Sequence, residues 1–593
     1  MRINEIHNLQ YAIKISWKFS KSFVLQSALI KALEYFGWVF YSSFFMRYVI
    51  NAMELEIAYK ELMQYLGICI LFFASVALYN NYFAENYMPV FRARFSDYLN
   101  GLIISKARNV DLRCYDDKDF YSKYTLAIES AENKIEAVIN DLMSSIFGGI
   151  ATVVIFFIML TIDKFICLFC IFPFLGNFVF GKICGRIVYQ KNKESSIFNR
   201  RIEYINRIMY LREYAKEIRL SNVFSLLIKQ YDDSIKGIEK IYKTGSYQAV
   251  IFHFLKSLFT FSFIFEGVLL YGAYRAIVSK SISFAVFSVL TGMMVSASLI
   301  MISCTNSINS LITNSIFVRN LREFMEYVPQ IPEEHKGIIP DKKIKSIEFR
   351  NVSFSYKKKV IIKKLSFVIE GGKSYAIVGH NGAGKTTLIK LLLRFYDPTE
   401  GEIFLNGVNI KSYNLQAYRD LFGIAFQEQR IFSASVRDNV LLHMKDSSIE
   451  NDVYSALKMA GVLERINELP LTIDSMLTRE FDDNGIQLSG GEFQKIAVSR
   501  VFSKKCPIKI FDEPSSALDP IAENSLFENI LENGKRKTLI FISHRLSSVK
   551  NVDVVFVLDK GEMIEKGNHI ELMRNKRMYA EMFSKQAEKY MAE

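Results

Sequence analysis

The segment Gly379-His380-Asn381-Gly382-Ala383-Gly384-Lys385-Thr386 decides the fold of the C-terminal part of the chain. Its spacing is that of a phosphate-binding loop, the Walker A pattern, in which glycines let backbone N–H groups approach phosphate oxygens. An apolar run at 374–378 predicts a strand before the loop. The helix predicted from Thr387 onward adds the positive end of its dipole. We expect Lys385 to reach the β- and γ-phosphates of ATP and Thr386 to ligate Mg²⁺.

Two further segments contain residues suited to a bound nucleotide. Residues 508–513 (IKIFDE) read as a strand that ends in two carboxylates. Asp512 suits a magnesium contact, and Glu513 suits the base that orients and activates the attacking water. Residues 488–492 (LSGGE) lie just before a predicted helix, and a Ser-Gly-Gly step at a helix start is another anion site.

Residues 346–593 therefore resemble the nucleotide-binding domain of ABC transporters, in motif order and in spacing. The resemblance implies that Tyr356 stacks on adenine. It implies that Gln427 senses magnesium and the attacking water. His544, after the strand predicted at 538–542, matches the switch histidine that contacts the γ-phosphate, and residues 516–519 match the D-loop. Ser489, Gly490 and Gly491 match the signature that binds the γ-phosphate of ATP held by the other half of a dimer.

The expected site falls into three groups of residues. The catalytic group is Glu513, His544 and Gln427. The magnesium group is Thr386, Gln427 and Asp512. The nucleotide-binding group is Tyr356, Gly379, Asn381, Gly382, Ala383, Gly384, Lys385, Thr386, Thr387, Ser489, Gly490 and Gly491.

Three positions depart from the family pattern. The signature ends in Glu492 where Gln is usual, and Lys509 interrupts a strand that is normally all apolar. Residues 479–485 (REFDDNG) replace the commoner Gly-Glu-Arg-Gly. None of these changes removes a group that touches phosphate, magnesium or water, so we expect an active ATPase.

The N-terminal half of the 593-residue chain has a different composition. Half of all residues are hydrophobic, and they crowd into runs before about residue 312. The net charge of +13 would suit nucleic-acid binding. Because Lys and Arg are scattered among helical loops, we interpret the charge as the positive-inside bias of a membrane protein, with no nucleic-acid partner. The seven cysteines show no zinc or disulfide spacing, which indicates a reducing cytoplasmic face.

Six apolar runs are long enough to cross a bilayer, which takes about 20 residues. They lie at 23–46, 62–82, 142–162, 165–183, 249–277 and 282–304. The connections after the second and fourth runs are long, basic and helical in pattern, which places them and both termini in the cytoplasm. Each contains a polar break, at 115–120 and 213–219, that predicts a short helix contacting the ATPase domain.

These observations predict a membrane protein with six transmembrane α-helices and long cytoplasmic extensions, followed by an α/β P-loop ABC nucleotide-binding domain. The expected parts are a cytoplasmic N-terminal helix (1–22), the transmembrane domain (23–312), a linker with three of the ten prolines (313–345) and the nucleotide-binding domain (346–593). The membrane half resembles bacterial exporters of the type IV fold with domain-swapped helices. The resemblance implies a half-transporter in the bacterial cytoplasmic membrane that pairs with a second half. We expect a homodimer, with a heterodimer as the alternative.

The predicted function is ATP-driven export of a peptide or a small amphipathic molecule by alternating access. The alternative is a lipid translocase of the same fold. A nucleotide-gated channel is disfavoured because it has no need of Glu513, and an importer is disfavoured because importers of this superfamily usually keep the two domains on separate chains.

Three charges inside the predicted spans bear on the cargo: Lys31, Glu34 and Glu266. Such groups usually face a cavity or one another. Lys31 and Glu34 are spaced to pair on one helix face, so they line a cargo path or form a structural ion pair. Glu266 lies in an apolar run and needs a partner from another helix or water.

Overall fold

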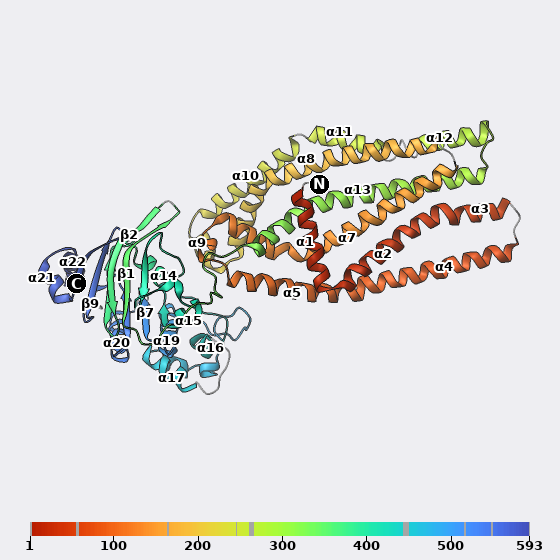
Figure 1. The fold of residues 1–593 in the computed structure, drawn as a ribbon. Coiled ribbons are helices and arrows are strands. Elements are labelled where there is room, and N and C mark those ends of the chain that lie inside the picture. The colour runs from red at the N-terminus through yellow and green to blue at the C-terminus, as the bar shows by residue number, and fades with distance from the viewer. Residues whose placement is uncertain are drawn as a thin grey trace. The chain divides into compact units, whose positions relative to one another are not determined.

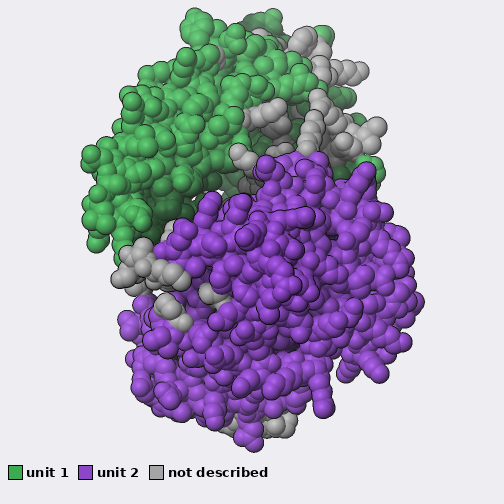
Figure 2. Space-filling view, turned by 90° about the vertical axis from the view of Figure 1, so that its left-hand side faces the viewer, with its two compact units in different colours: residues 1–108, 118–327 green, residues 109–117, 328–593 purple. Residues whose placement is uncertain are grey.

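The structure is a computed structural model. It describes residues 3–54, 58–162, 165–244, 246–259, 266–357, 359–442, 450–514, 518–546 and 550–591. The chain divides into two compact units (Figure 2). The first comprises residues 1–108 and 118–327, and the second comprises residues 109–117 and 328–593.

The described part of the first unit is helical (Figure 1). Its α-helices are α1 (Ile3–Phe19), α2 (Lys21–Val39), α3 (Met46–Glu54), α4 (Tyr59–Tyr82), α5 (Met88–Arg108), α7 (Lys118–Ile162), α8 (Ile166–Tyr210), α9 (Ala215–Leu220), α10 (Val223–Lys243), α11 (Ser246–Ser257), α12 (Gly267–Ala273) and α13 (Phe284–Glu326). Shorter π and 3₁₀ segments are η1 (Phe40–Phe45), η2 (Phe83–Tyr87), η3 (Arg212–Tyr214) and η5 (Tyr274–Val278). Helices α7 and α8 have 45 residues each. At about 1.5 Å per residue each is roughly twice as long as a bilayer core is thick, in agreement with the predicted extensions.

The core of this unit forms where α2, α7 and α13 pack together. Helix α13 runs beside α7 (Figure 1), and their buried apolar side chains form one cluster with Tyr35 and Val39 of α2. The Tyr35 hydroxyl joins Ser144 Oγ at 2.8 Å and Ser303 Oγ at 3.0 Å. The Tyr35 hydroxyl therefore links the three helices by hydrogen bonds. In an apolar setting such polar groups must find their partners within the protein.

Four helical segments of the described residues are long and apolar enough to cross a membrane. They are Lys21–Ala52, Tyr59–Arg108, Asn133–Thr161 and Val286–Glu326. The first two contain the first and second predicted spans, and the last two overlap most of the third and sixth. The fourth predicted span, 165–183, coincides with the N-terminal part of α8 apart from its first residue, which caps the helix. The fifth includes residues 260–265, which lie outside the described residues, as does the hairpin at 163–164. The count of six spans stays a prediction.

The segment expected as a linker begins later than predicted. Helix α13 continues to Glu326, so residues 313–326 are helical. Its C-terminal turns bury Val318, Leu321 and Phe324, and this apolar face stabilises the helix until the prolines begin at Pro329. The non-helical connection therefore starts near Tyr327, which caps the helix.

The second unit is an α/β domain with two sheets. Its strands are β1 (Ser346–Tyr356), β2 (Lys359–Glu370), β3 (Ser374–Gly379), β4 (Glu400–Leu405), β5 (Val408–Asn409), β6 (Phe422–Ala425), β7 (Ile508–Asp512), β8 (Thr538–Ile542), β9 (Val554–Asp559) and β10 (Glu562–Gly567). Its helices are α6 (Leu112–Tyr115), α14 (Lys385–Leu392), α15 (Leu415–Asp420), α16 (Val436–Leu441), α17 (Glu450–Met459), α18 (Leu463–Asn467), α19 (Gly490–Ser503), α20 (Pro520–Asn533), α21 (His569–Asn575) and α22 (Met578–Met591), with 3₁₀ turns η6 (Ile410–Ser412) and η8 (Thr472–Asp474).

The larger sheet has the order β10-β9-β3-β8-β7-β6, parallel from β9 to β6, and the smaller antiparallel sheet has the order β2-β1-β4-β5. Central strands of the larger sheet are buried on both faces. On β3, Ile377 joins the core shared with the smaller sheet, while Ala376 and Val378 join the core beneath α20 and α22. Two buried faces explain why these strands read as continuous apolar runs.

The short segment 109–117 belongs to the second unit although its neighbours in sequence belong to the first. The buried Asp111 carboxylate accepts hydrogen bonds from the backbone N–H groups of Gln330 (2.8 Å) and Ile331 (3.0 Å). Asp116 accepts one from the Tyr396 hydroxyl at 2.9 Å. The first predicted contact segment, 115–120, thus contacts the α/β domain through Asp116. The second, 213–219, forms η3 and part of α9 in the first unit.

Candidate functional site

Four adjacent parallel strands bring the predicted site residues to one edge of the larger sheet. The phosphate-binding loop follows β3, Gln427 follows β6, Glu513 follows β7 and His544 follows β8. The carboxyl ends of parallel strands meet at the same edge, which is where open α/β sheets bind ligands.

At two positions of the loop the backbone has a conformation that favours glycine. Gly379 has φ +152, and a Cβ there would lie 2.1 Å from the Leu558 carbonyl oxygen. Gly384 caps α14 in the left-handed region, with φ +103. Lys385 Nζ donates hydrogen bonds to the carbonyls of Gly379 (2.9 Å) and His380 (3.1 Å). Burial lowers the pKa of Lys385, an effect that the Glu513 and Asp512 carboxylates partly offset.

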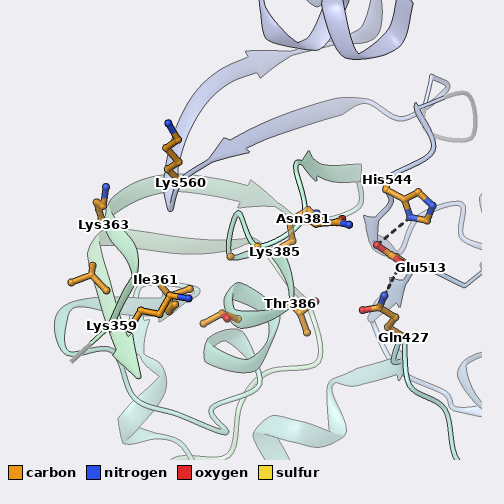
Figure 3. Close-up of a pocket in the computed structure, with 14 residues that line it drawn as sticks. Lys359, Ile361, Lys363, Asn381, Lys385, Thr386, Gln427, Glu513, His544 and Lys560 are labelled. Atoms are coloured by element: carbon orange, nitrogen blue, oxygen red, sulfur yellow. Dashed lines mark hydrogen bonds and ion pairs between the residues drawn. The ribbon is translucent and has the colours of Figure 1, made fainter. Parts of the chain in front are cut away.

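The Glu513 carboxylate is held between the two other predicted catalytic side chains. Gln427 Nε2 donates to its Oε2 at 2.9 Å, and His544 Nδ1 lies 3.2 Å from its Oε1 (Figure 3). The backbone of Glu513 is in the left-handed region, at φ +51. Its N–H donates to the Ile542 carbonyl at 3.0 Å, and its own carbonyl accepts from Gln494 Nε2 at 3.1 Å. These contacts offset the cost of the strained backbone and fix the direction of the side chain.

Asp512 has the surroundings of a cation ligand. It is 1% exposed, and neither carboxylate oxygen has a hydrogen-bond partner among the described residues. Burial raises its pKa to about 6, and Thr386 is near enough to lower that pKa without making a well-formed hydrogen bond. A buried carboxylate without a partner is costly unless a cation neutralises it. Asp512 and the Thr386 hydroxyl are hard oxygen donors, so the residues fit Mg²⁺.

A cavity of about 680 Å³ joins the loop to the Glu513 cluster. Figure 3 shows Gln427, Glu513 and His544 on one side of it, lysines on the other, and Asn381, Lys385 and Thr386 between them. The predicted residues that line it are Asn381, Gly382, Gly384, Lys385, Thr386, Thr387, Gln427, Glu513 and His544. Gly379 and Ala383 are buried behind the lining.

Sequence reasoning missed three cationic residues of this cavity. Lys359 and Lys363 come from β2, and Lys560 comes from the turn between β9 and β10. The period-two pattern places Lys359 and Lys363 on one face of β2. No motif indicates that this face meets the β9–β10 turn, because that meeting depends on the packing of two sheets. With Lys385, these side chains make the cavity suited to a polyanion.

Other predicted residues lie away from the cavity lining. Tyr356 packs edge-on against Phe354 and Tyr396, with ring centroids 4.8 Å and 5.3 Å away. Of the signature residues, Ser489 caps α19, and Gly490 and Gly491 are its first two residues. In the D-loop, Ser516 and Ala517 lie outside the described residues, while Asp519 caps α20 by accepting from the N–H groups of residues 521 and 522.

The comparison with protein families fits this geometry. Residues 362–516 match the family model described as ABC transporter.

This segment is an ABC transporter domain.

The chain is a half-transporter in which apolar helices are fused to an ABC ATPase domain. The predicted fold class is confirmed apart from the count of six spans. It is similar to the subtilin transport ATP-binding protein SpaT of Bacillus subtilis, with 29% identity over 91% of this chain and 86% of that protein. It is also similar to the ATP-dependent lipid A-core flippase of Haemophilus influenzae, with 36% identity over 43% of each chain. The fold matches a bacterial Atm1-family ABC exporter solved with ATP bound, with a TM-score of 0.78, 21% identity and coverage of 95% and 98% of the two chains.

Proposed function

We propose that this protein hydrolyses ATP to export a peptide or a small amphipathic molecule across the bacterial cytoplasmic membrane. One observation carries the catalytic part of this proposal: the Glu513 carboxylate is clamped between Gln427 and His544 at the mouth of a phosphate-binding loop. Because both carboxylate oxygens are held in place, Glu513 can act as a base toward a nucleotide in the cavity.

In the proposed reaction Glu513 orients the attacking water and accepts a proton from it. The loop N–H groups and Lys385 stabilise charge on the phosphates, as phosphoryl transfer requires. His544 contacts the γ-phosphate and keeps Glu513 in place. Asp512, Thr386 and Gln427 would hold Mg²⁺, which neutralises phosphate charge when it is bound. Tyr356 stacks on adenine, a role that needs its ring to turn from Tyr396 toward the base.

We also propose that two halves share each ATP. Ser489, Gly490 and Gly491 do not line the cavity of their own chain, yet they begin a 14-residue helix whose first N–H groups suit an anion. A second half can place this segment over the γ-phosphate. Every residue needed for both roles is present in one chain, so a homodimer suffices, and a heterodimer is the alternative.

For the cargo, we favour a peptide over a lipid. Similarity to the subtilin transporter extends over 91% of the chain, whereas similarity to the flippases extends over 38% to 55%. Lipid translocation is the second candidate, because identity to the flippases is higher where they align. Lys31 Nζ and Glu34 Oε2 pair at 2.7 Å, which supports a structural role for these two. Glu266 is exposed on its helix, and we propose it as the cargo-facing charge.

The test is ATP turnover by the full chain in lipid nanodiscs, for the wild type and Glu513→Gln. The amide keeps the shape of the carboxylate but accepts no proton, so we expect turnover to fall by about 100-fold or more while binding of a fluorescent ATP analogue persists. Retention of a tenth of wild-type turnover would exclude Glu513 as the base.

The same preparation tests the cargo class. We expect cationic amphipathic peptides of the antimicrobial type to raise wild-type turnover, and added lipid A or phospholipid to leave it unchanged. Stimulation by lipid alone would favour the translocase. Glu532→Gln, an exposed change on α20, is the control for both measurements.

A further inference from the structure

The signature helix carries an acidic group at its start. Ser489 caps α19, and Glu492 folds back so that its Oε2 accepts the Ser489 N–H at 2.7 Å and the Ser489 hydroxyl at 2.9 Å. This is a capping box, which fixes the first turn of a helix. The Ser489 hydroxyl is therefore directed at Glu492, and a carboxylate lies where the helix dipole is most positive.

A neighbouring arginine balances this carboxylate. Arg465 of α18 places its Nε 3.2 Å from Glu492 Oε1 and its Nη1 2.8 Å from Glu468 Oε2. Burial raises the pKa of Glu492, but the hydrogen bonds from Ser489 and the charge of Arg465 outweigh burial, so the pKa lies below its usual range. Glu492 is thus ionised at neutral pH, and Arg465 is its cationic partner.

An ionised Glu492 poses a problem for the proposed shared site. The γ-phosphate of a nucleotide held by a second half would approach Ser489 and Gly490, and a negative charge at Glu492 would repel it. A glutamine in this position would complete the capping box without the charge. The chain therefore needs a compensating cation close to Glu492, and Arg465 is placed to supply it.

We propose that Arg465 is a positioning residue of the signature. It neutralises Glu492 so that Ser489, Gly490 and Gly491 can bind the γ-phosphate. The inference rests on the proposed function. It has a distinctive consequence: Arg465 matters only while Glu492 is acidic. A purely structural link between α18 and α19 would not have this property, because loss of either partner would break that link.

The experiment compares Arg465→Met, Glu492→Gln and the double variant in the full chain, by ATP turnover in nanodiscs over a range of ATP concentrations. We expect Arg465→Met to lower kcat/KM for ATP about tenfold, because the uncompensated Glu492 carboxylate repels the γ-phosphate. Glu492→Gln should equal or exceed the wild type. The double variant should recover to within about threefold of Glu492→Gln, because no charge is left to compensate.

Two controls separate charge compensation from structure. Glu468→Gln breaks the other ion pair of Arg465 and should change kcat/KM by less than about twofold, as expected for an exposed pair. Arg465→Lys retains the charge and should keep most of the activity, even if Arg465→Met lowers thermal stability. A loss that persists in the double variant would overturn the inference, as would an Arg465→Met protein as active as the wild type. If the wild type itself shows no turnover, the proposed function fails and the inference fails with it.

Discussion

At the scale of single residues, Lys509 is the departure from pattern with the clearest physical cost. It sits in β7, three residues before Asp512, and is 3% exposed. Its ammonium group lies 5.1 Å from the Phe502 ring. Burial, with Lys537 nearby, lowers its pKa to about 8. None of the described carboxylates pairs with Lys509, and a buried cation without such a partner destabilises the folded domain at neutral pH.

We predict that Lys509→Met stabilises the protein. The pKa of Lys509 is lower in the folded chain than when unfolded, so the unfolded chain binds more protons between about pH 8 and pH 10.4. Folding stability therefore rises with pH through this window, and below it the cost is constant, at most about 3 kcal/mol. Thermal unfolding of the full chain should show a higher Tm for Lys509→Met at pH 7, with a gap that narrows toward pH 10.

The exposed Lys535 provides the matched control, since Lys535→Met should leave Tm nearly unchanged at either pH. A lower Tm for Lys509→Met than for the wild type at pH 7 would contradict burial of the Lys509 charge as the cause. So would a difference in Tm that is the same at pH 7 and pH 10.

At the scale of elements, the sequence predicted the strands and motifs of the ABC domain well. The reason is that β3, β7 and β8 are buried on both faces and end at residues with defined chemistry. Contacts between distant segments were not predictable. Lys359 and Lys560 line the same cavity because β2 packs against the β9–β10 turn, where the Lys363 N–H donates to the Gly561 carbonyl at 2.9 Å. The linker was expected to begin at 313, before the end of α13, because the last turns of that helix are polar in part and their burial depends on neighbouring helices.

The link between segment 109–117 and the residues after α13 yields a prediction at this scale. The Asp111 side chain is 3% exposed, and its two hydrogen bonds to residues 330 and 331 join segment 109–117 to the connection after α13 within the second unit. Asp111→Ala leaves two N–H groups without this acceptor, at a cost of about 1–3 kcal/mol. We expect faster hydrogen exchange in 109–117 and 328–331.

Glu334→Gln, an exposed change in the same connection, should leave exchange unaltered. Equal protection of both segments in Asp111→Ala and the wild type would mean that other contacts hold the loop.

At the scale of the whole molecule, the central claim is that each ATP lies between the phosphate-binding loop of one half and the signature of the other. The two sets of residues occupy different places in one chain: Lys385 lines the cavity and Ser489 does not. In this proposal one chain alone supplies two half-sites. Damage to either set should inactivate both sites of a homodimer, whereas one lesion of each kind on separate chains leaves one site intact.

The most direct measurement is ATP turnover by mixed dimers, co-expressed with two different tags and isolated by tandem affinity purification. Lys385→Ala and Ser489→Arg should each be inactive alone, and the mixed dimer should regain turnover because its one undamaged site combines Lys385 of one chain with Ser489 of the other. The control pairs the wild type with the Lys385→Ala/Ser489→Arg double variant, which puts one lesion in each site and should stay inactive. Mixed dimers no more active than this control would contradict the shared site.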